Sequence, residues 1–188
     1  MKNIAIFASG SGSNAQNIAE YFAQHPEIRV SLILANKPEA FVLEIARNLG
    51  IDSVVFARQA FYYTEKVLEI LRDHQIGFIV LAGFLWFVPS YLIKAFPGKI
   101  VNIHPALLPK HGGKGMYGDK VHQAVIESGD KSTGITIHYV NDHYDEGEII
   151  FQDSFPVQPE DTPETIAHKV HLLEYKHFPR VIEEVLSR

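Results

Sequence analysis

Asn102 and His104 carry an amide and an imidazole at alternate positions of a short apolar run. Side chains in a β-strand repeat their direction every two residues, so both groups are expected to project to the same side. An amide and an imidazole placed together suit a reaction in which a carbonyl oxygen becomes negatively charged. A core asparagine and a capping histidine fit the same pattern, so this segment alone leaves both interpretations open.

Farther along the chain, His138 precedes the acidic segment Asp145–Gly147. If the fold brings Asp145 close to His104, its carboxylate could orient the imidazole and relay protons. Acidic residues in a short loop more often belong to a solvated turn. The distance between Asp145 and His104 in the folded chain therefore decides between these interpretations.

A glycine- and serine-rich segment, Ser9–Asn14 with the sequence S-G-S-G-S-N, follows the first apolar run. Glycines between a strand and a helix let backbone N–H groups approach a phosphate at the positive end of the helix. The glycines and Ala15 also satisfy a loose dinucleotide fingerprint, which requires an acidic residue at the end of the second strand. That strand ends in A-N-K-P at Ala35–Pro38, which disfavours NAD. A tight turn without a ligand remains the alternative.

The 188 residues include 22 acidic and 17 basic side chains, for a formal charge of −5, and 46% of the residues are hydrophobic. An acidic chain without a Lys/Arg cluster argues against a general nucleic-acid surface. The absence of cysteine excludes disulfides, thiolate metal sites and a catalytic thiol, and fits a reducing cytoplasm. No segment approaches the roughly 20 apolar residues of a membrane span, and the N-terminus does not resemble a signal peptide. We therefore expect a cytoplasmic protein that binds neither nucleic acid nor membranes.

The ten histidines raise the question of a metal site. No H-E-x-x-H motif is present, and the only close pair on a predicted helix is His168 with His171. We therefore expect no metal.

Short apolar runs alternate with helical patterns through the N-terminal half of the chain. Runs rich in β-branched or aromatic residues predict strands at Asn3–Ala8, Arg29–Ala35, Ser53–Phe56, Phe78–Leu81 and Lys99–Asn102. The spacing of apolar residues predicts helices at Asn14–Gln24, Glu39–Leu49, Phe61–His74 and Pro89–Ala95. This alternation implies a mostly parallel sheet with helices on both faces.

After Asn102 the pattern changes. The glycine-rich loop Lys110–Gly118, whose glycines suggest mobility, is followed by a predicted helix at Asp119–Ser128, and predicted strands at Thr133–Val140 and Glu148–Val157 flank a short loop. Strands joined so closely are expected to pair antiparallel at one edge of the sheet. Thr162 as the N-cap and Pro163 in the first turn begin the final helix. We predict a single α/β domain over residues 1–188, with ligands beyond the carboxyl ends of the strands.

In their order along the chain, these motifs resemble the glycinamide ribonucleotide (GAR) formyltransferase family of purine synthesis. The matching segments are S-G-S-G-S-N at 9–14, A-N-K at 35–37, L-A-G-F at 81–84, N-I-H-P-A-L-L-P at 102–109, G-I-T-I-H-Y-V at 134–140 and D-E-G at 145–147. They span nearly the whole chain, and although each is weak alone, their combination is specific. The resemblance implies a single-domain, Rossmann-like formyltransferase fold with a mostly parallel twisted sheet and an antiparallel C-terminal strand pair.

The resemblance also implies an activity. The formyl group of 10-formyltetrahydrofolate would pass directly to the amine of GAR, giving formyl-GAR and tetrahydrofolate in the synthesis of purines. Asn102 and His104 would stabilise the oxyanion, whereas Asp145 would position His104 and assist proton transfer to the leaving folate nitrogen. No covalent enzyme intermediate and no metal is required, and the partners are the two small molecules, with a monomer or homodimer as the assembly.

Binding residues follow from the same resemblance. The phosphate of GAR is assigned to Gly12, Ser13 and Asn14, and its other polar atoms to Glu174. Folate is assigned, largely through backbone contacts, to Leu85, Trp86, Phe87, Val88, Asn102, Asn141 and Asp145. This chain departs from the family at Trp86, where a basic residue is frequent, and in the loop 111–118, which is longer than in many relatives.

Relatives with the same formyl-transfer core act on methionyl-tRNA or on nucleotide-linked amino sugars, or hydrolyse formyl-folate. They usually append a further domain, for which we expect no room in this chain, and its acidity disfavours tRNA. A non-catalytic phosphate-binding module and a dehydrogenase are the competing classes. Consumption of 10-formyl-folate only in the presence of GAR would exclude the former, and NAD(P)H binding would support the latter.

Overall fold

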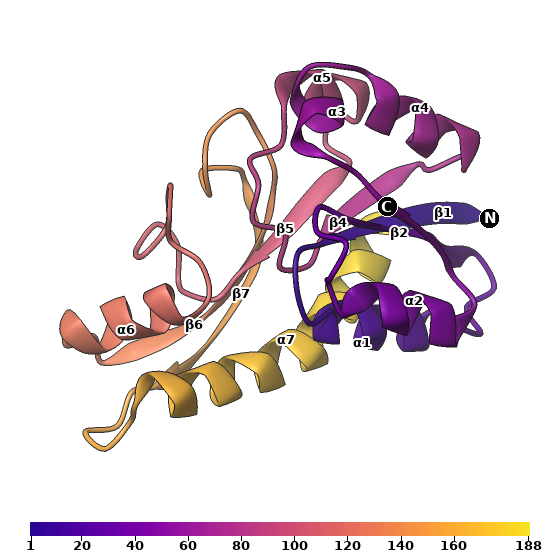
Figure 1. Ribbon diagram of the computed structural model, residues 1–188. Coiled ribbons are helices and arrows are strands. Elements are labelled where there is room, and N and C mark those ends of the chain that lie inside the picture. The colour runs from indigo at the N-terminus through magenta and orange to yellow at the C-terminus, as the bar shows by residue number, and fades with distance from the viewer.

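A seven-stranded sheet forms the centre of the molecule in the computed structural model, which describes residues 1–188 (Figure 1). The strands are β1 (Lys2–Ala8), β2 (Ile28–Ala35), β3 (Asp52–Val55), β4 (Phe78–Leu81), β5 (Ile100–His104), β6 (Ser132–Tyr139) and β7 (Ile149–Pro156). Their order is β3-β2-β1-β4-β5-β6-β7, and only the pairs β5–β6 and β6–β7 are antiparallel. The predicted α/β fold, with an antiparallel C-terminal pair, is confirmed.

Helices cover both faces of this sheet. They are α1 (Ser13–Tyr21), α2 (Val42–Leu49), α3 (Arg58–Tyr62), α4 (Lys66–Asp73), α5 (Ser90–Ala95), α6 (Asp119–Glu127) and α7 (Pro163–Leu186). α1, α2 and α7 lie on one face and α3, α4 and α5 on the other (Figure 1). Each face has its own buried apolar cluster, of 27 residues under α1, α2 and α7 and of 17 residues under α3 to α5. None of the helices is long and apolar enough to cross a bilayer.

The predicted helix Phe61–His74 is wrong in its extent, because the chain forms two helices, α3 and α4, in this region. Thr64 separates them: its hydroxyl donates to the Ala60 carbonyl at 2.9 Å and accepts from the Lys66 N–H at 3.2 Å. A side chain that bonds to nearby backbone groups in this way competes with the continuous helical pattern. The apolar spacing of α4 holds nevertheless, since Val67, Leu68 and Leu71 are buried.

The strand order places β1 beside β4, with the chain continuing from β1 toward one edge and from β4 toward the other. At such a switch point the loops beyond the carboxyl ends of the strands diverge and leave a crevice. Ser9 links the two loops: its N–H donates to the Gly83 carbonyl at 3.1 Å and its hydroxyl accepts from the Leu85 N–H at 3.0 Å. Hydrogen bonds from Ser9 therefore connect the two walls of the crevice.

Gly134 allows β6 and β7 to approach closely, because a Cβ atom built there would lie 1.9 Å from the Asp153 carbonyl oxygen. We predict that Gly134→Ala lowers the free energy of unfolding by at least about 2 kcal/mol, since neighbouring backbone must shift to admit the methyl group. Gly77→Ala is the matched control, because its Cβ would meet only the Asn3 carbonyl at 3.9 Å. Denaturant unfolding measures both, and equal stability of the two variants would contradict the prediction.

Candidate active site

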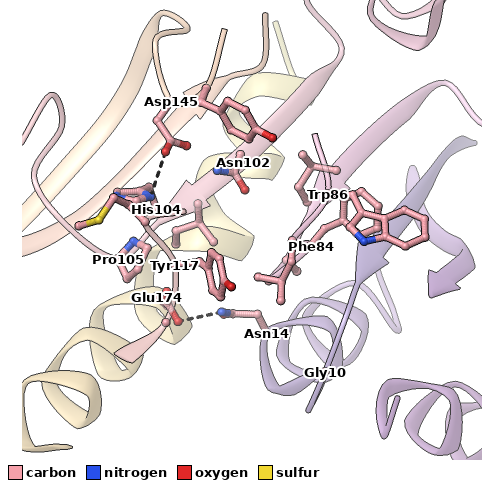
Figure 2. Close-up of a pocket in the computed structure, with 18 of the residues that line it drawn as sticks. Gly10, Asn14, Phe84, Trp86, Asn102, His104, Pro105, Tyr117, Asp145 and Glu174 are labelled. Atoms are coloured by element: carbon pink, nitrogen blue, oxygen red, sulfur yellow. Dashed lines mark hydrogen bonds and ion pairs between the residues drawn. The ribbon is translucent and has the colours of Figure 1, made fainter. Parts of the chain in front are cut away.

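A cleft with a volume of about 360 Å³ lies at the switch point and extends along the ends of β4 and β5. Figure 2 shows Asn102, His104 and Asp145 in one part of it, Asn14 and Glu174 in another, and Trp86 to one side. Every site residue expected from the sequence lines this cleft: Gly12, Ser13, Asn14, Leu85, Trp86, Phe87, Val88, Asn102, His104, Asn141, Asp145 and Glu174. The fold thus brings together segments from the whole length of the chain.

His104 is the last residue of β5, and only 3% of its surface is exposed. Its Nε2 lies 2.8 Å from the carbonyl oxygen of His111, which can only accept, so Nε2 carries a proton. Its Nδ1 faces Asp145, with 3.7 Å between Nδ1 and Oδ2. This distance is too long for a hydrogen bond but close enough for a strong charge interaction. The carboxylate therefore acts on the nitrogen that is free of other partners.

Asp145 is held in place by its backbone and by a neighbouring loop. Its φ of +55° lies in the left-handed region, which aspartate tolerates better than most residues. The Gly113 N–H donates to Oδ2 at 2.9 Å. Gly147 is required nearby, because a Cβ there would lie 1.6 Å from the Tyr139 carbonyl oxygen. The D-E-G motif is thus a turn of fixed shape.

Asn102 lies directly opposite His138 in the pairing of β5 with β6. The Tyr139 carbonyl accepts from Nδ1 of His138 at 2.8 Å, so Nε2 is left as an acceptor and receives the Asn102 amide at 3.1 Å. This contact fixes the orientation of the amide and leaves its second N–H free. His138 belonged to a recognised motif, but sequence reasoning did not include it among the site residues. The strand register was the missing signal.

Burial governs the charge of both imidazoles. Desolvation lowers the pKa of His104 and of His138 below the ordinary histidine value. The Asp145 carboxylate acts in the opposite direction and raises the pKa of each, but burial has the larger effect. Both rings are therefore neutral near pH 7, and Nδ1 of His104 is the ring nitrogen left available as a proton acceptor.

The other part of the cleft begins where α1 starts. Gly12, at the N-cap with φ +74°, offers no side-chain cap, so the first N–H groups of α1 lack protein partners there. The Asn14 amide donates to Oε2 of Glu174 at 2.8 Å, and Nδ1 of His171 lies 2.9 Å from the same oxygen. The hydrogen bond to Glu174 raises the pKa of His171. The helix start and this paired carboxylate form a polar subsite.

Two buried polar atoms in this subsite have no protein partner, Oδ1 of Asn14 and Nδ1 of His122. Buried groups of this kind are normally satisfied, and both residues line the cleft, which suits binding of a polar ligand. Sequence reasoning missed His122, and it considered His171 only for metal binding. Their positions depend on the packing of α6 against α7, which no local motif reveals.

The segment Leu85–Val88 forms the apolar wall of the cleft. Phe87 contacts Tyr144 with ring centroids 4.6 Å apart, which joins this wall to the loop that carries Asn141 and Asp145. The indole of Trp86 packs against Phe56, with centroids 5.9 Å apart, and the Arg58 guanidinium lies 5.7 Å from its centre. The Trp86 ring is therefore part of an aromatic cluster and makes a cation–π contact with Arg58.

No group of three or more His, Cys, Asp or Glu side chains is arranged to hold a metal ion. The arrangement instead provides an amide donor, a neutral imidazole and a carboxylate around one space. These groups can stabilise a developing oxyanion and move a proton.

Comparison with known proteins identifies the family of this chain. The model of the formyl transferase family matches residues 2–182. The chain belongs to this family. The phosphoribosylglycinamide formyltransferase of Bacillus subtilis is 38% identical over 192 residues, which cover 100% of this chain and 96% of that protein. The chloroplastic enzyme of the same name from Arabidopsis thaliana is 41% identical over 187 residues.

The share of each relative that is covered differs. The chain spans 64% of the Arabidopsis protein and 60% of a Vigna unguiculata relative, just under two thirds of either. Among solved structures, phosphoribosylglycinamide formyltransferase from Bacillus halodurans superposes with a TM-score of 0.89 at 36% identity, over 100% of this chain and 96% of that one. The resemblance to GAR formyltransferases that the motifs predicted is confirmed.

Histidine side-chain NMR can test the charge state of this formyl transferase family member. We predict that neutral His104 carries its proton on Nε2 and titrates below the ordinary value of about 6.5. Asp145→Asn should lower the pKa of His104 further, because it removes the carboxylate that favours the imidazolium. A pKa above the ordinary value, or a rise in Asp145→Asn, would contradict this account.

Proposed function

We propose that this protein transfers the formyl group of 10-formyltetrahydrofolate to the amine of GAR, yielding formyl-GAR and tetrahydrofolate, a step of purine biosynthesis. One observation carries the proposal: Asn102, His104 and Asp145 surround the part of the cleft that lies between a helix N-terminus and an apolar wall. The names of the relatives point to the same activity. One domain over residues 1–188 would hold both substrates.

GAR fits the polar end of the cleft. The N–H groups of Gly12, Ser13 and Asn14 lie at the positive end of α1, where a phosphate monoester binds favourably. Glu174, held by two donors, is placed to accept hydrogen bonds from the remaining polar atoms of GAR. The unpartnered Oδ1 of Asn14 adds a further acceptor on the same side. This distribution matches a ligand with an anionic end and a hydroxylated middle.

The folate fits the apolar wall. Leu85–Val88 offers apolar surface together with backbone groups, and Asn141 stands on the facing loop. Since the Trp86 ring packs against its aromatic neighbours, we propose that this residue contributes mainly through its backbone. The reactive end of the folate would then lie toward Asn102 and Asp145.

The catalytic groups would act in sequence. Neutral His104 cannot donate to the oxyanion as expected from the sequence, because its one N–H is bonded to the His111 carbonyl. As the amine nitrogen bonds to the formyl carbon, Nδ1 of His104 instead accepts the proton that the amine loses. Asp145 stabilises the resulting imidazolium, and the free N–H of Asn102 donates to the formyl oxygen as it becomes negative. When the bond from the formyl carbon to the folate nitrogen breaks, Nδ1 returns the proton to that nitrogen. No bond to the enzyme forms.

The dehydrogenase alternative lacks support in the structure. β2 ends at Ala35, and the next residue is Asn36 rather than an acid that could hold a ribose. Cytoplasmic location and a monomeric or homodimeric state remain predictions from the sequence.

A coupled assay tests the proposed reaction. Loss of 10-formyltetrahydrofolate should require GAR and should not occur with water or simple amines alone.

Asp145→Asn should lower kcat by about 10²–10⁴-fold, and Asn102→Ala or His104→Ala by about 10²–10³-fold or more, with smaller effects on KM. The kcat of the parent enzyme should fall as pH decreases through the pKa of His104, because the protonated ring cannot accept a proton. Turnover without GAR, or full activity of His104→Ala, would refute the assignment.

Ser13 provides a test of the phosphate position. Ser13→Asp places a negative charge in the first turn of α1, which favours the helix but repels a phosphate. We predict that KM for GAR rises at least about tenfold, whereas KM for the folate changes less than about threefold. Ser13→Asn is the control, because asparagine has the shape of aspartate without its charge. Its KM for GAR should stay near that of the parent enzyme. Gly12 is less suitable, because a Cβ there would lie 2.6 Å from the side chain of Val42. Equal KM values for the two variants would move the phosphate elsewhere.

A further inference from the structure

The start of the glycine-rich loop, Lys110–Gly113, touches both proposed proton-transfer groups through its backbone. The His111 carbonyl accepts from Nε2 of His104 at 2.8 Å, and the Gly113 N–H donates to Asp145 at 2.9 Å. Although its glycines suggested mobility, this part of the loop is therefore bonded to the candidate active site. A segment with two such contacts can set the geometry of the reaction only if it is itself held.

We propose that His111 and Asp130 form a clamp that positions His104 and Asp145 for proton transfer. The proposal rests on the catalytic roles given above to His104 and Asp145. Neither clamp residue lines the cleft, so both are positioning residues rather than catalytic ones. They act on the reacting groups through the loop backbone.

The clamp is a short, largely buried hydrogen bond between the two side chains. Oδ2 of Asp130 lies 2.7 Å from Nε2 of His111, and their side chains are 13% and 15% exposed. Lys110 reaches Oδ1 of the same carboxylate at 2.8 Å, but its side chain is 69% exposed. Hydrogen bonds from Lys110 and His111 lower the pKa of Asp130, so it stays ionised at neutral pH. The buried His111 contact is therefore expected to hold the loop, whereas the solvated Lys110 contact adds little.

The loop backbone is shaped to transmit this contact. His111 has φ +54°, an uncommon conformation for a residue other than glycine, and this local turn accompanies the contact between its carbonyl and His104. At Gly112, a Cβ would lie 2.6 Å from the side chain of Leu108 and 3.3 Å from Cβ of Asp145. The loop thus packs directly against Asp145. If His111 is released, the carbonyl and the Gly113 N–H are free to move together.

The His111 carbonyl matters because it selects the tautomer of His104. With Nε2–H bonded to the carbonyl, Nδ1 keeps its lone pair toward Asp145 and the cleft. Without that acceptor, the proton can move to Nδ1, and the ring can no longer accept a proton from the amine there. The groups that act on the pKa of His104 are Asp145, His138 and His111, and His122 lies near enough for His104 to lower its pKa. The carboxylate and the carbonyl bond raise the pKa of His104, and the two neighbouring imidazoles lower it.

Kinetics of three variants test the clamp. Asp130→Asn is isosteric, and His111→Gly accepts the positive φ. Each should lower kcat by about 10- to 100-fold, the effect of a misplacement of roughly 1 Å, while KM for either substrate changes less than about threefold. The acid limb of the kcat profile should move to lower pH, because the lost carbonyl bond raises the pKa of His104 more than the His111 imidazole lowers it. Lys110→Met is the control and should keep kcat within about twofold, with an unchanged acid limb.

The double variant His111→Gly/Asp130→Asn should lose no more activity than the more damaged single variant, because both changes break one contact. Thermal unfolding confirms that the compared proteins are folded, and NMR of His104 should show a loss of the Nε2–H preference in His111→Gly. Parent-like kcat and acid limb in both single variants would overturn the clamp, as would additive losses in the double variant. If His104→Ala retains full activity, the proposed chemistry fails and the clamp with it. If His104→Ala is inactive and the clamp variants are unaffected, only the clamp is refuted.

Discussion

The register between β5 and β6 is the constraint on which the candidate site depends. Asn102 pairs with His138 and His104 with Thr136, so the polar side chains of both strands face the same side. Alternate residues such as Ile103 belong to the core under α1 and α7. A slip of one residue would turn the imidazoles into that core and expose its apolar side chains. Because such an exchange is very unfavourable, packing of the core fixes the direction in which the side chains of the candidate site point.

Charge is balanced differently in the two parts of the cleft. At the polar end, the start of α1 presents unpaired N–H groups, and Glu174 places a buried carboxylate nearby that would by itself repel a phosphate. Asn14 and His171 both bond to that carboxylate, and His171 gains proton affinity from the contact. These two contacts partly balance the negative charge of Glu174, so the nearby start of α1 remains available for an anion.

The parts of the fold that the sequence predicted are those with local signals. Alternation of apolar runs gave the strands, and the two-residue repeat placed Asn102 and His104 on one side, because both follow from the periodicity of regular structure. The break at Thr64 was missed, since the apolar spacing continues through it. The contacts around His111 were also missed: they depend on a positive φ at a non-glycine residue and on Asp130, which lies just beyond α6 and nineteen positions further along the chain. No periodic pattern in the sequence predicts a contact between two loop residues so far apart.

The two ring nitrogens of His104 have different surroundings, because Asp145 lies 3.7 Å from Nδ1 whereas Nε2 is hydrogen-bonded to the His111 carbonyl. Had the carboxylate made a direct hydrogen bond to Nδ1, that nitrogen would carry its proton permanently and could not accept another. At the observed distance the carboxylate still raises the pKa of His104 through its charge, against the lowering caused by burial. Burial and the carboxylate thus act on the pKa of His104 in opposite directions, and burial has the larger effect. The His111 carbonyl accepts the hydrogen bond from Nε2, and Nδ1 is thus left without a hydrogen-bond partner beside the charge of Asp145.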